Sequence, residues 1–140
     1  MLDDVSLARF VDAQANSYAT ALSEIQAGAK RSHWMWWIFP QLRGLGHSPT
    51  AQVYGIASIG EARAYLDHAL LGPRYRECVE ALQRLDMADP VAVFGSIDTM
   101  KLRSSLTLFD AASPDPLFAE ALDRWFLGER DPATRQLLKD

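Results

Sequence analysis

Apolar residues recur at intervals of three and four along most of the chain, which is the spacing of one face of an α-helix. The clearest such stripe consists of Tyr75, Cys78, Val79, Leu82 and Leu85. Two comparable stripes lie near the ends of the chain: Leu7, Phe10, Val11, Tyr18, Leu22 and Ile25, and Leu117, Phe118, Ala121, Leu122, Trp125 and Phe126. No alternating run bounded by hairpin-turn residues is present, so the pattern predicts an all-α protein.

Residues that begin and end helices agree with this periodicity. Asp89, Asp115 and Asp131 each precede a proline, which places a side-chain acceptor at the N-cap and a proline at the first helical position. Ser58 and Glu61 have the spacing of a capping box. Three glycines stand where helices need a residue that tolerates positive φ: Gly28, Gly95 and Gly128. The predicted helices cover residues 5–27, 33–39, 59–70, 73–86, 90–94, 98–110, 116–127 and 132–138.

The most unusual segment places Trp34, Trp36, Trp37 and Phe39 within six residues. Whether it is a helix or a strand, this segment is apolar on two sides, and both sides must be covered. We interpret residues 33–39 as a short helix that ends at Pro40 and lies at the centre of the protein. The expected fold is a compact bundle of about seven helices around this tryptophan-rich helix, with residues 1–140 forming a single domain.

Burial of this segment would leave the polar residues around it poorly hydrated and in need of partners. Those residues are Lys30, Arg31 and His33 before it, Gln41 and Arg43 after it, and Gln14, which replaces an apolar residue in the first stripe. A ligand could supply the partners. The alternatives are a buried amide bonded to the main chain for Gln14 and a core histidine with one hydrogen bond for His33.

A second polar cluster lies on the helix that begins at Asp98. Lys101, Arg103, Ser104 and Thr107 place two cations and hydroxyl groups within seven residues, a combination that can bind a carboxylate or a phosphate. The alternative is an ordinary solvated helix face. Asp98 and the His33 side chain are candidate general bases if the site is catalytic, although no pair of carboxylates or nucleophile motif supports that role.

Composition and charge narrow the classes of function. The chain has 140 residues, of which 49% are hydrophobic and 23% charged. Its net charge of −4 gives no surplus of positive charge for neutralising phosphates, so nucleic acid is not an expected partner. The longest apolar run, residues 34–39, is too short to cross a membrane. The acidic first residues do not resemble a secretory signal, and the single Cys78 indicates a reducing compartment, so we expect a cytoplasmic protein.

Metal and cofactor signals are missing from the sequence. His33, His47 and His68 lie too far apart to form a metal-ligand pair. Phosphate-binding and dinucleotide-binding glycine motifs are absent as well. We therefore expect neither a metal nor a cofactor.

Several short motifs make the chain similar to a bacterial family known as domain of unknown function 1810. They are Arg9-Phe10, Ala13-Gln14, the run from Ser32 to Trp36, Phe39-Pro40-Gln41, Gly44-Leu45-Gly46, Tyr54-Gly55-Ile56, the run from Lys101 to Ser105, and Thr107-Leu108-Phe109. The resemblance covers nearly the whole chain. It implies a small, all-helical domain and supplies no established activity. Some members carry the label calpastatin-like, which does not fit this composition, because an inhibitor of that type is a disordered, polar chain.

Three functional hypotheses remain open at this point. In the first, a small anionic molecule with a ring, such as a nucleotide derivative, binds between residues 33–43 and 101–107, with or without hydrolysis. In the second, the exposed part of the tryptophan-rich segment mediates protein interaction or homodimerisation. In the third, the segment is entirely structural. The sequence does not decide whether the protein is an enzyme.

Overall fold

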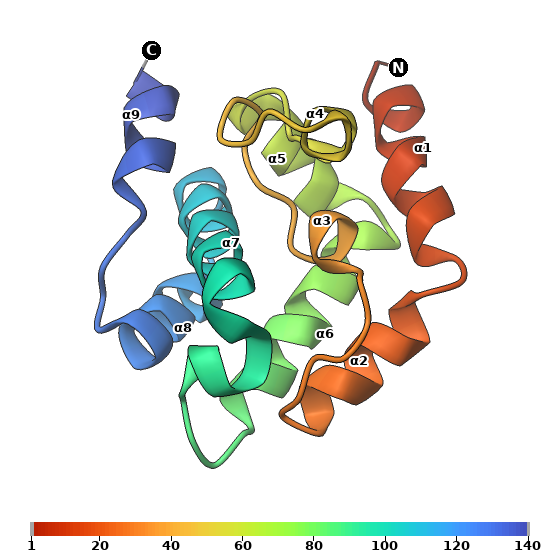
Figure 1. Cartoon of the computed structure of the whole chain (residues 1–140). Coiled ribbons are helices and arrows are strands. Elements are labelled where there is room, and N and C mark those ends of the chain that lie inside the picture. Colours follow the sequence, from red (N-terminus) through yellow and green to blue (C-terminus); the bar gives the residue numbers. More distant parts are fainter. Residues whose placement is uncertain (1, 140) are drawn as a thin grey trace.

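The computed structural model describes residues 2–139 of the chain and, for side chains, residues 7–139. In this part of the chain the prediction of an all-helical fold is confirmed, with no strand and one isolated parallel bridge between Leu42 and Ile56. Figure 1 shows the helices α1 (Leu2–Gln14), α2 (Tyr18–Gln26), α3 (Met35–Ile38), α4 (Pro49–Tyr54), α5 (Ile59–Asp67), α6 (Leu71–Gln83), α7 (Pro90–Ala112), α8 (Pro116–Phe126) and α9 (Pro132–Lys139).

The predicted helix starts are confirmed by their caps. The side chains of Asp89, Asp115 and Asp131 each accept a hydrogen bond from a main-chain amide two or three residues later, at 2.9–3.2 Å. Ser58 does the same for α5 at 3.2 Å. The three glycines predicted to end helices all have positive φ, between 71° and 80°.

The structure differs from the predicted helices in three main places. The helix expected over residues 5–27 is broken after Gln14, because the Ser17 hydroxyl donates to the carbonyl of Ala13 and accepts from the indole of Trp37, in competition with the helical main chain. The structure also contains α4, which lies between the predicted helices 33–39 and 59–70 and which Ser48 caps by accepting from the amide of Ala51 at 3.1 Å.

The long helix α7 combines two predicted helices. Gly95 has φ 80° and ψ 166°, which bends the chain between an initial turn and the main part of the helix. In Figure 1, α7 lies beside α8 and α9, and the short α3 lies between α7 and α1. This arrangement brings the tryptophan-rich segment close to the first turns of α7 after the bend.

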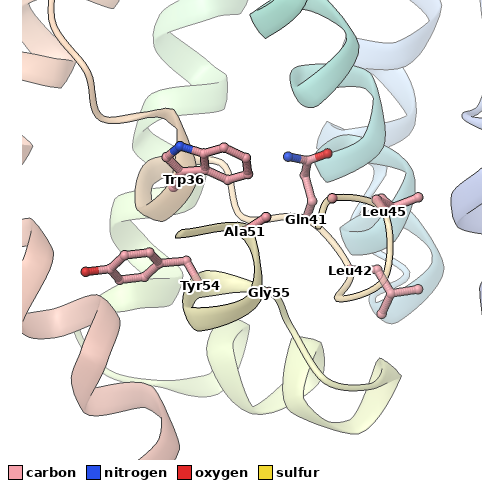
Figure 2. Close-up of a pocket in the computed structure, with 8 residues that line it drawn as sticks. Trp36, Gln41, Leu42, Leu45, Ala51, Tyr54 and Gly55 are labelled. Atoms are coloured by element: carbon pink, nitrogen blue, oxygen red, sulfur yellow. The ribbon is translucent and has the colours of Figure 1, made fainter. Parts of the chain in front are cut away.

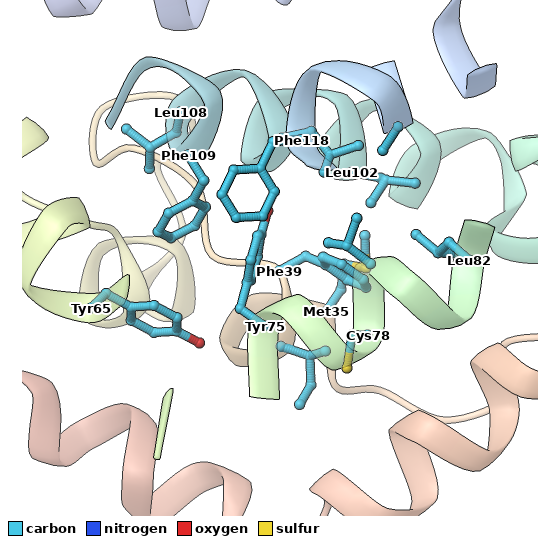
Figure 3. Close-up of a cluster of buried hydrophobic side chains, with 14 of the residues drawn as sticks. Met35, Phe39, Tyr65, Tyr75, Cys78, Leu82, Leu102, Leu108, Phe109 and Phe118 are labelled. Atoms are coloured by element: carbon cyan, nitrogen blue, oxygen red, sulfur yellow. The ribbon is translucent and has the colours of Figure 1, made fainter. Parts of the chain in front are cut away.

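Aromatic rings from four helices and the end of α3 form the centre of the core (Figure 3). The ring of Tyr75 lies 4.3 Å from that of Phe109, 5.4 Å from that of Phe118 and 5.7 Å from that of Phe39, measured between centroids. Its hydroxyl is 2.9 Å from the hydroxyl of Ser105. The polar atom of this ring therefore has a partner inside the core, as a buried tyrosine requires.

The tryptophan-rich segment is only partly in the core. Trp34, Met35, Ile38 and Phe39 are at most 3% exposed, which confirms a central short helix. Trp36 and the neighbouring Trp37 are half-buried. The segment therefore packs one side into the core and presents the other side near the surface.

A single carboxylate holds the turn that leads into α3. Glu24 accepts hydrogen bonds from the amides of Arg31 (2.7 Å) and Ser32 (2.9 Å), from the Ser32 hydroxyl (2.6 Å) and from the indole of Trp34 (3.0 Å). Partial burial raises the pKa of Glu24, but these four hydrogen bonds outweigh that effect and lower the pKa from 4.5 to about 2.

The depressed pKa of Glu24 predicts a pH-dependent contribution to stability. Because the folded pKa lies below the unfolded value, the contribution is fully present above about pH 4.5 and is lost as the pH falls towards 2. The substitution Glu24→Gln should lower the free energy of unfolding at neutral pH by roughly 1–3 kcal/mol. Urea denaturation at several pH values should show the difference from wild type shrinking in acid. Glu80→Gln, on the exposed face of α6, is the matched control. A constant difference across this range would contradict the assignment.

Candidate functional site

A pocket of about 300 Å³ opens between α3, α7 and the start of α9. It lies where the sequence predicted a site, between residues 33–43 and 101–107. Its lining residues are Trp36, Gln41, Leu45, Gly46, Ile97, Met100, Lys101, Ser104, Asp131 and Ala133. The walls are thus mainly apolar, with a few polar groups directed into the space, which is the usual composition of a small-molecule site.

Lys101 lines the pocket, and Asp98 and Lys30 form a cluster of ion pairs behind it. The ammonium of Lys101 lies 3.3 Å from one carboxylate oxygen of Asp98, and the ammonium of Lys30 lies 2.9 Å from the other. Each ammonium also lies over an indole: Lys101 is 4.0 Å from the ring centroid of Trp36, and Lys30 is 5.1 Å from that of Trp34. The lysines share one carboxylate, so one positive charge is in excess.

The loop after α3 contributes the amide of Gln41. Two main-chain hydrogen bonds hold this loop beside Ile56. The Ile56 amide donates to the Gln41 carbonyl at 2.8 Å, and the Arg43 amide donates to the Ile56 carbonyl at 2.7 Å. Figure 2 shows the smaller adjoining depression, where the Trp36 ring and the Gln41 side chain lie on the side facing α7. Within the described residues, the Gln41 amide makes no hydrogen bond of its own and is available to a ligand.

The opposite wall is held by hydrogen bonds between α7 and the start of α9. The Asp131 amide donates to the Thr107 hydroxyl at 2.9 Å, and that hydroxyl donates to the Arg103 carbonyl at 2.7 Å. One carboxylate oxygen of Asp131 accepts from the amide and the hydroxyl of Thr134, at 2.9 and 2.6 Å. Asp131 is therefore fixed in position while its side chain borders the pocket.

The structure brings four of the predicted ligand-binding residues together at the pocket: Trp36, Gln41, Lys101 and Ser104. Lys30 is one ion pair removed from it, through Asp98. The interpretation of the Lys101 helix as an ordinary solvated face is wrong, because Ser104 and Thr107 are at most 6% exposed.

Gln14 lies away from the pocket and is a buried amide, which was the alternative to a ligand contact. Its amide nitrogen donates to the carbonyl of Trp37 at 2.7 Å and to the hydroxyl of Tyr65 at 3.1 Å, and its amide oxygen accepts from Arg74 at 3.3 Å. The side chain is 1% exposed and does not line the pocket. Gln14 thus connects α1, α3, α5 and α6 as a buried amide.

The expectation that Arg31, His33 and Arg43 are sheltered is wrong, because all three are exposed. The cause at the first two positions is the Glu24 carboxylate, which binds the main-chain amides of residues 31 and 32 and the indole of Trp34. With those groups turned inward, the side chains of Arg31 and His33 face the solvent. Neither residue lines the pocket.

Arg103 and Thr107 do not line the pocket, but both contact Asp131, which does. The Arg103 guanidinium lies 3.7 Å from a carboxylate oxygen of Asp131 and 3.7 Å from one of Glu129. Thr107 is buried and bonded to the Asp131 amide. Both residues therefore help to position Asp131.

Sequence reasoning missed six lining residues: Leu45, Gly46, Ile97, Met100, Asp131 and Ala133. A signal existed for two of them, since Ile97 and Met100 share the helical stripe of Lys101 and Ser104. Asp131 was interpreted only as a helix cap. No pattern in the sequence links residues 131–133 to the tryptophan-rich segment.

Neither of the two candidate general bases lines the pocket. Both oxygens of Asp98 are paired with ammonium groups, and His33 is exposed outside the pocket. Among the described side chains, those of residues 7–139, no cluster of three or more His, Cys, Asp or Glu could hold a metal ion. No helix within residues 2–139 is long and apolar enough to cross a membrane.

Comparison with known proteins gives a family and a structural relative without an assigned activity. The family model described as "Protein of unknown function (DUF1810)" matches residues 4–138. A crystal structure of the conserved hypothetical protein Rv1873 from Mycobacterium tuberculosis is similar, with 46% sequence identity, a TM-score of 0.95 and 99% of each chain covered. No curated protein matches the chain.

The shared Asp98 carboxylate predicts strong energetic coupling with Lys30. The Lys30 and Asp98 side chains are only 9% and 18% exposed, so removing one partner leaves the other charge poorly solvated. A double-mutant cycle with Lys30→Gln and Asp98→Asn, measured by urea denaturation, should give a coupling energy of roughly 1–3 kcal/mol. The control cycle uses Arg103→Gln and Glu129→Gln, where Glu129 is 73% exposed and the coupling should be under about 1 kcal/mol. Equal couplings in both cycles would refute the prediction.

Proposed function

The chain belongs to the DUF1810 family, and from the geometry of its pocket we propose that the protein binds a small ring-containing anion beside Trp36. The observation that carries this proposal is the Lys101 ammonium, held between Asp98 and the Trp36 ring on the wall of a mainly apolar pocket. An anion can approach this ammonium, while the ring attached to it contacts the apolar wall.

Charge supports an anionic group at this end of the pocket. Two ammonium groups share the single carboxylate of Asp98, so an anionic group meets a local excess of positive charge at this end. Lys101 is 20% exposed and can therefore reach a ligand, whereas the more buried Lys30 keeps Asp98 in place. The partly desolvated setting strengthens the interaction relative to a surface lysine.

Shape supports a ligand with one ring system. A pocket of about 300 Å³ lies at the lower end of the range of roughly 300–1,000 Å³ seen for small-molecule sites. Because Lys101 covers one face of the Trp36 indole, a ligand ring would contact the other face or the edge, or would displace the ammonium. A nucleotide derivative fits this volume only if it is no larger than a single nucleotide. The proposal is limited to binding, since neither Asp98 nor His33 lines the pocket.

Binding can be tested by titration with 4-methylbenzoate and with adenosine 5′-monophosphate, followed by tryptophan fluorescence. At least one of these ring-containing anions should bind and change the signal, and Trp36→Phe should remove most of that change. Lys101→Gln should weaken binding about tenfold, because a charge-assisted hydrogen bond is lost. Arg31→Gln removes the same charge from an exposed site outside the pocket and is the matched control. Equal affinity in wild type and Lys101→Gln would exclude the proposed site.

A second candidate function is self-association through the rim of the same pocket. Ile97 is 71% exposed and Met100 is 62% exposed, and both border the pocket beside the half-buried Trp36. A second copy of the chain could bury this patch, as apolar and aromatic anchors do at interfaces.

Sedimentation over a range of protein concentrations tests this candidate. The mass should rise from 15.6 kDa towards twice that value, and Met100→Glu should keep the protein monomeric because a carboxylate would be buried at the interface. Met87→Glu, at another exposed methionine, is the control. A mass of 15.6 kDa at every concentration would rule self-association out.

A further inference from the structure

The wall of the pocket opposite the lysines carries an acceptor with no hydrogen bond. One carboxylate oxygen of Asp131 is occupied by Thr134, whereas the other lies 3.7 Å from the Arg103 guanidinium, too far for a hydrogen bond. Within the described part of the chain nothing donates to that second oxygen. The side chain is 12% exposed and borders the pocket. Asp131 can therefore accept a hydrogen bond from a ligand.

Ser104, between Lys101 and Thr107 on α7, adds a second acceptor to the pocket. Its hydroxyl donates to the carbonyl of Met100 at 3.0 Å, so only the oxygen lone pairs remain for a ligand. Gln41 can either donate or accept. The polar groups of the pocket thus separate into an ammonium at one end, from Lys101, and acceptors towards the other end.

The main-chain positions that hold the two groups are separated along α7. The Asp131 main chain is bonded to Thr107, six residues after Lys101 along the helix. Six residues of α-helix rise by about 9 Å. Polar groups at opposite ends of a ring suit this separation better than adjacent groups do.

The charges around the pocket balance overall. Lys101 and Asp131 line the pocket, and the ion pairs next to it add Lys30, Asp98, Arg103 and Glu129, which makes three cations and three carboxylates. A ligand with two negative charges would place one of them near the Asp131 carboxylate, where like charges repel. A ligand without net charge leaves the balance intact.

We infer that the ligand of this pocket is dipolar, with an anionic group that meets Lys101 and a cationic or hydrogen-bond-donating group at the far end of the ring that meets Asp131. This inference deepens the proposed function and rests on it. Lys101 provides attraction for the anionic group, and Asp131 determines specificity by favouring a donor and disfavouring a second anion.

Three benzoates that differ only at the para position test the inference: 4-(aminomethyl)benzoate, 4-methylbenzoate and benzene-1,4-dicarboxylate. Their affinities for the full-length protein should be measured by NMR titration of the backbone amides. The aminomethyl compound should bind about tenfold more tightly than the methyl compound, which corresponds to one added charge-assisted hydrogen bond. The dicarboxylate should bind more weakly than either.

The substitution Asp131→Asn isolates the proposed role. Asparagine remains a good N-cap for α9, so the fold is retained, but the charge is removed. The preference for the aminomethyl compound should fall to about twofold or less, and the dicarboxylate should gain affinity. Asp115→Asn changes the equivalent cap of α8, away from the pocket, and should leave the order of affinities unchanged.

The two proposals fail in different ways. If none of the three benzoates shifts amide signals around the pocket, the dipolar inference is wrong, and if adenosine 5′-monophosphate shifts none either, the proposed binding function is wrong as well. If 4-methylbenzoate binds at the pocket but the aminomethyl compound binds no more tightly, the dipolar inference is wrong. It is also overturned if the dicarboxylate binds most tightly, or if the preference survives in Asp131→Asn.

Discussion

The position of the tryptophan-rich segment depends on the carboxylate of Glu24. It is the acceptor for two main-chain amides, one hydroxyl and one indole in the turn that leads from α2 into α3. These bonds turn Trp34 into the core and direct the side chains of residues 31 and 33 outward. The same geometry places Lys30 over the Trp34 ring, from where its ammonium reaches Asp98 on α7. One set of hydrogen bonds to Glu24 thus helps to set the position of the pocket.

The ion pairs beside the pocket are better understood as positioning devices than as sources of stability. Partly buried charges lose hydration, and their mutual attraction offsets that loss only when the geometry is good. Here Asp98 holds two ammonium groups, and each of them also lies over an indole ring. The arrangement fixes Lys101 at the pocket wall without enclosing it. On the opposite wall, Thr107, Thr134 and Arg103 fix Asp131 in the same way.

Local sequence patterns were sufficient to predict most of the helices and much of the core. The Asp-Pro pairs predicted three helix starts because an N-cap acceptor and a proline act on the residues next to them. The stripe from Tyr75 to Leu82 predicted a buried face because helical periodicity is a local property. The patterns were misleading at Ser17, where a hydrogen bond to Trp37, twenty residues away, accompanies the break between α1 and α2. They also missed the short α4, which Ser48 caps between the predicted helices 33–39 and 59–70.

The amino-acid pattern alone was enough to predict an all-helical chain with Trp34 in its core and to suggest a candidate site between residues 33–43 and 101–107, since periodicity, caps and aromatic content act over short distances. The folded structure decided which polar side chains line the pocket found there. It turned Arg31 and His33 to the solvent, used Gln14 as a buried amide and brought Asp131 to the pocket that Lys101 also lines. These outcomes depend on hydrogen bonds and packing between residues far apart in the chain, and no local spacing encodes them.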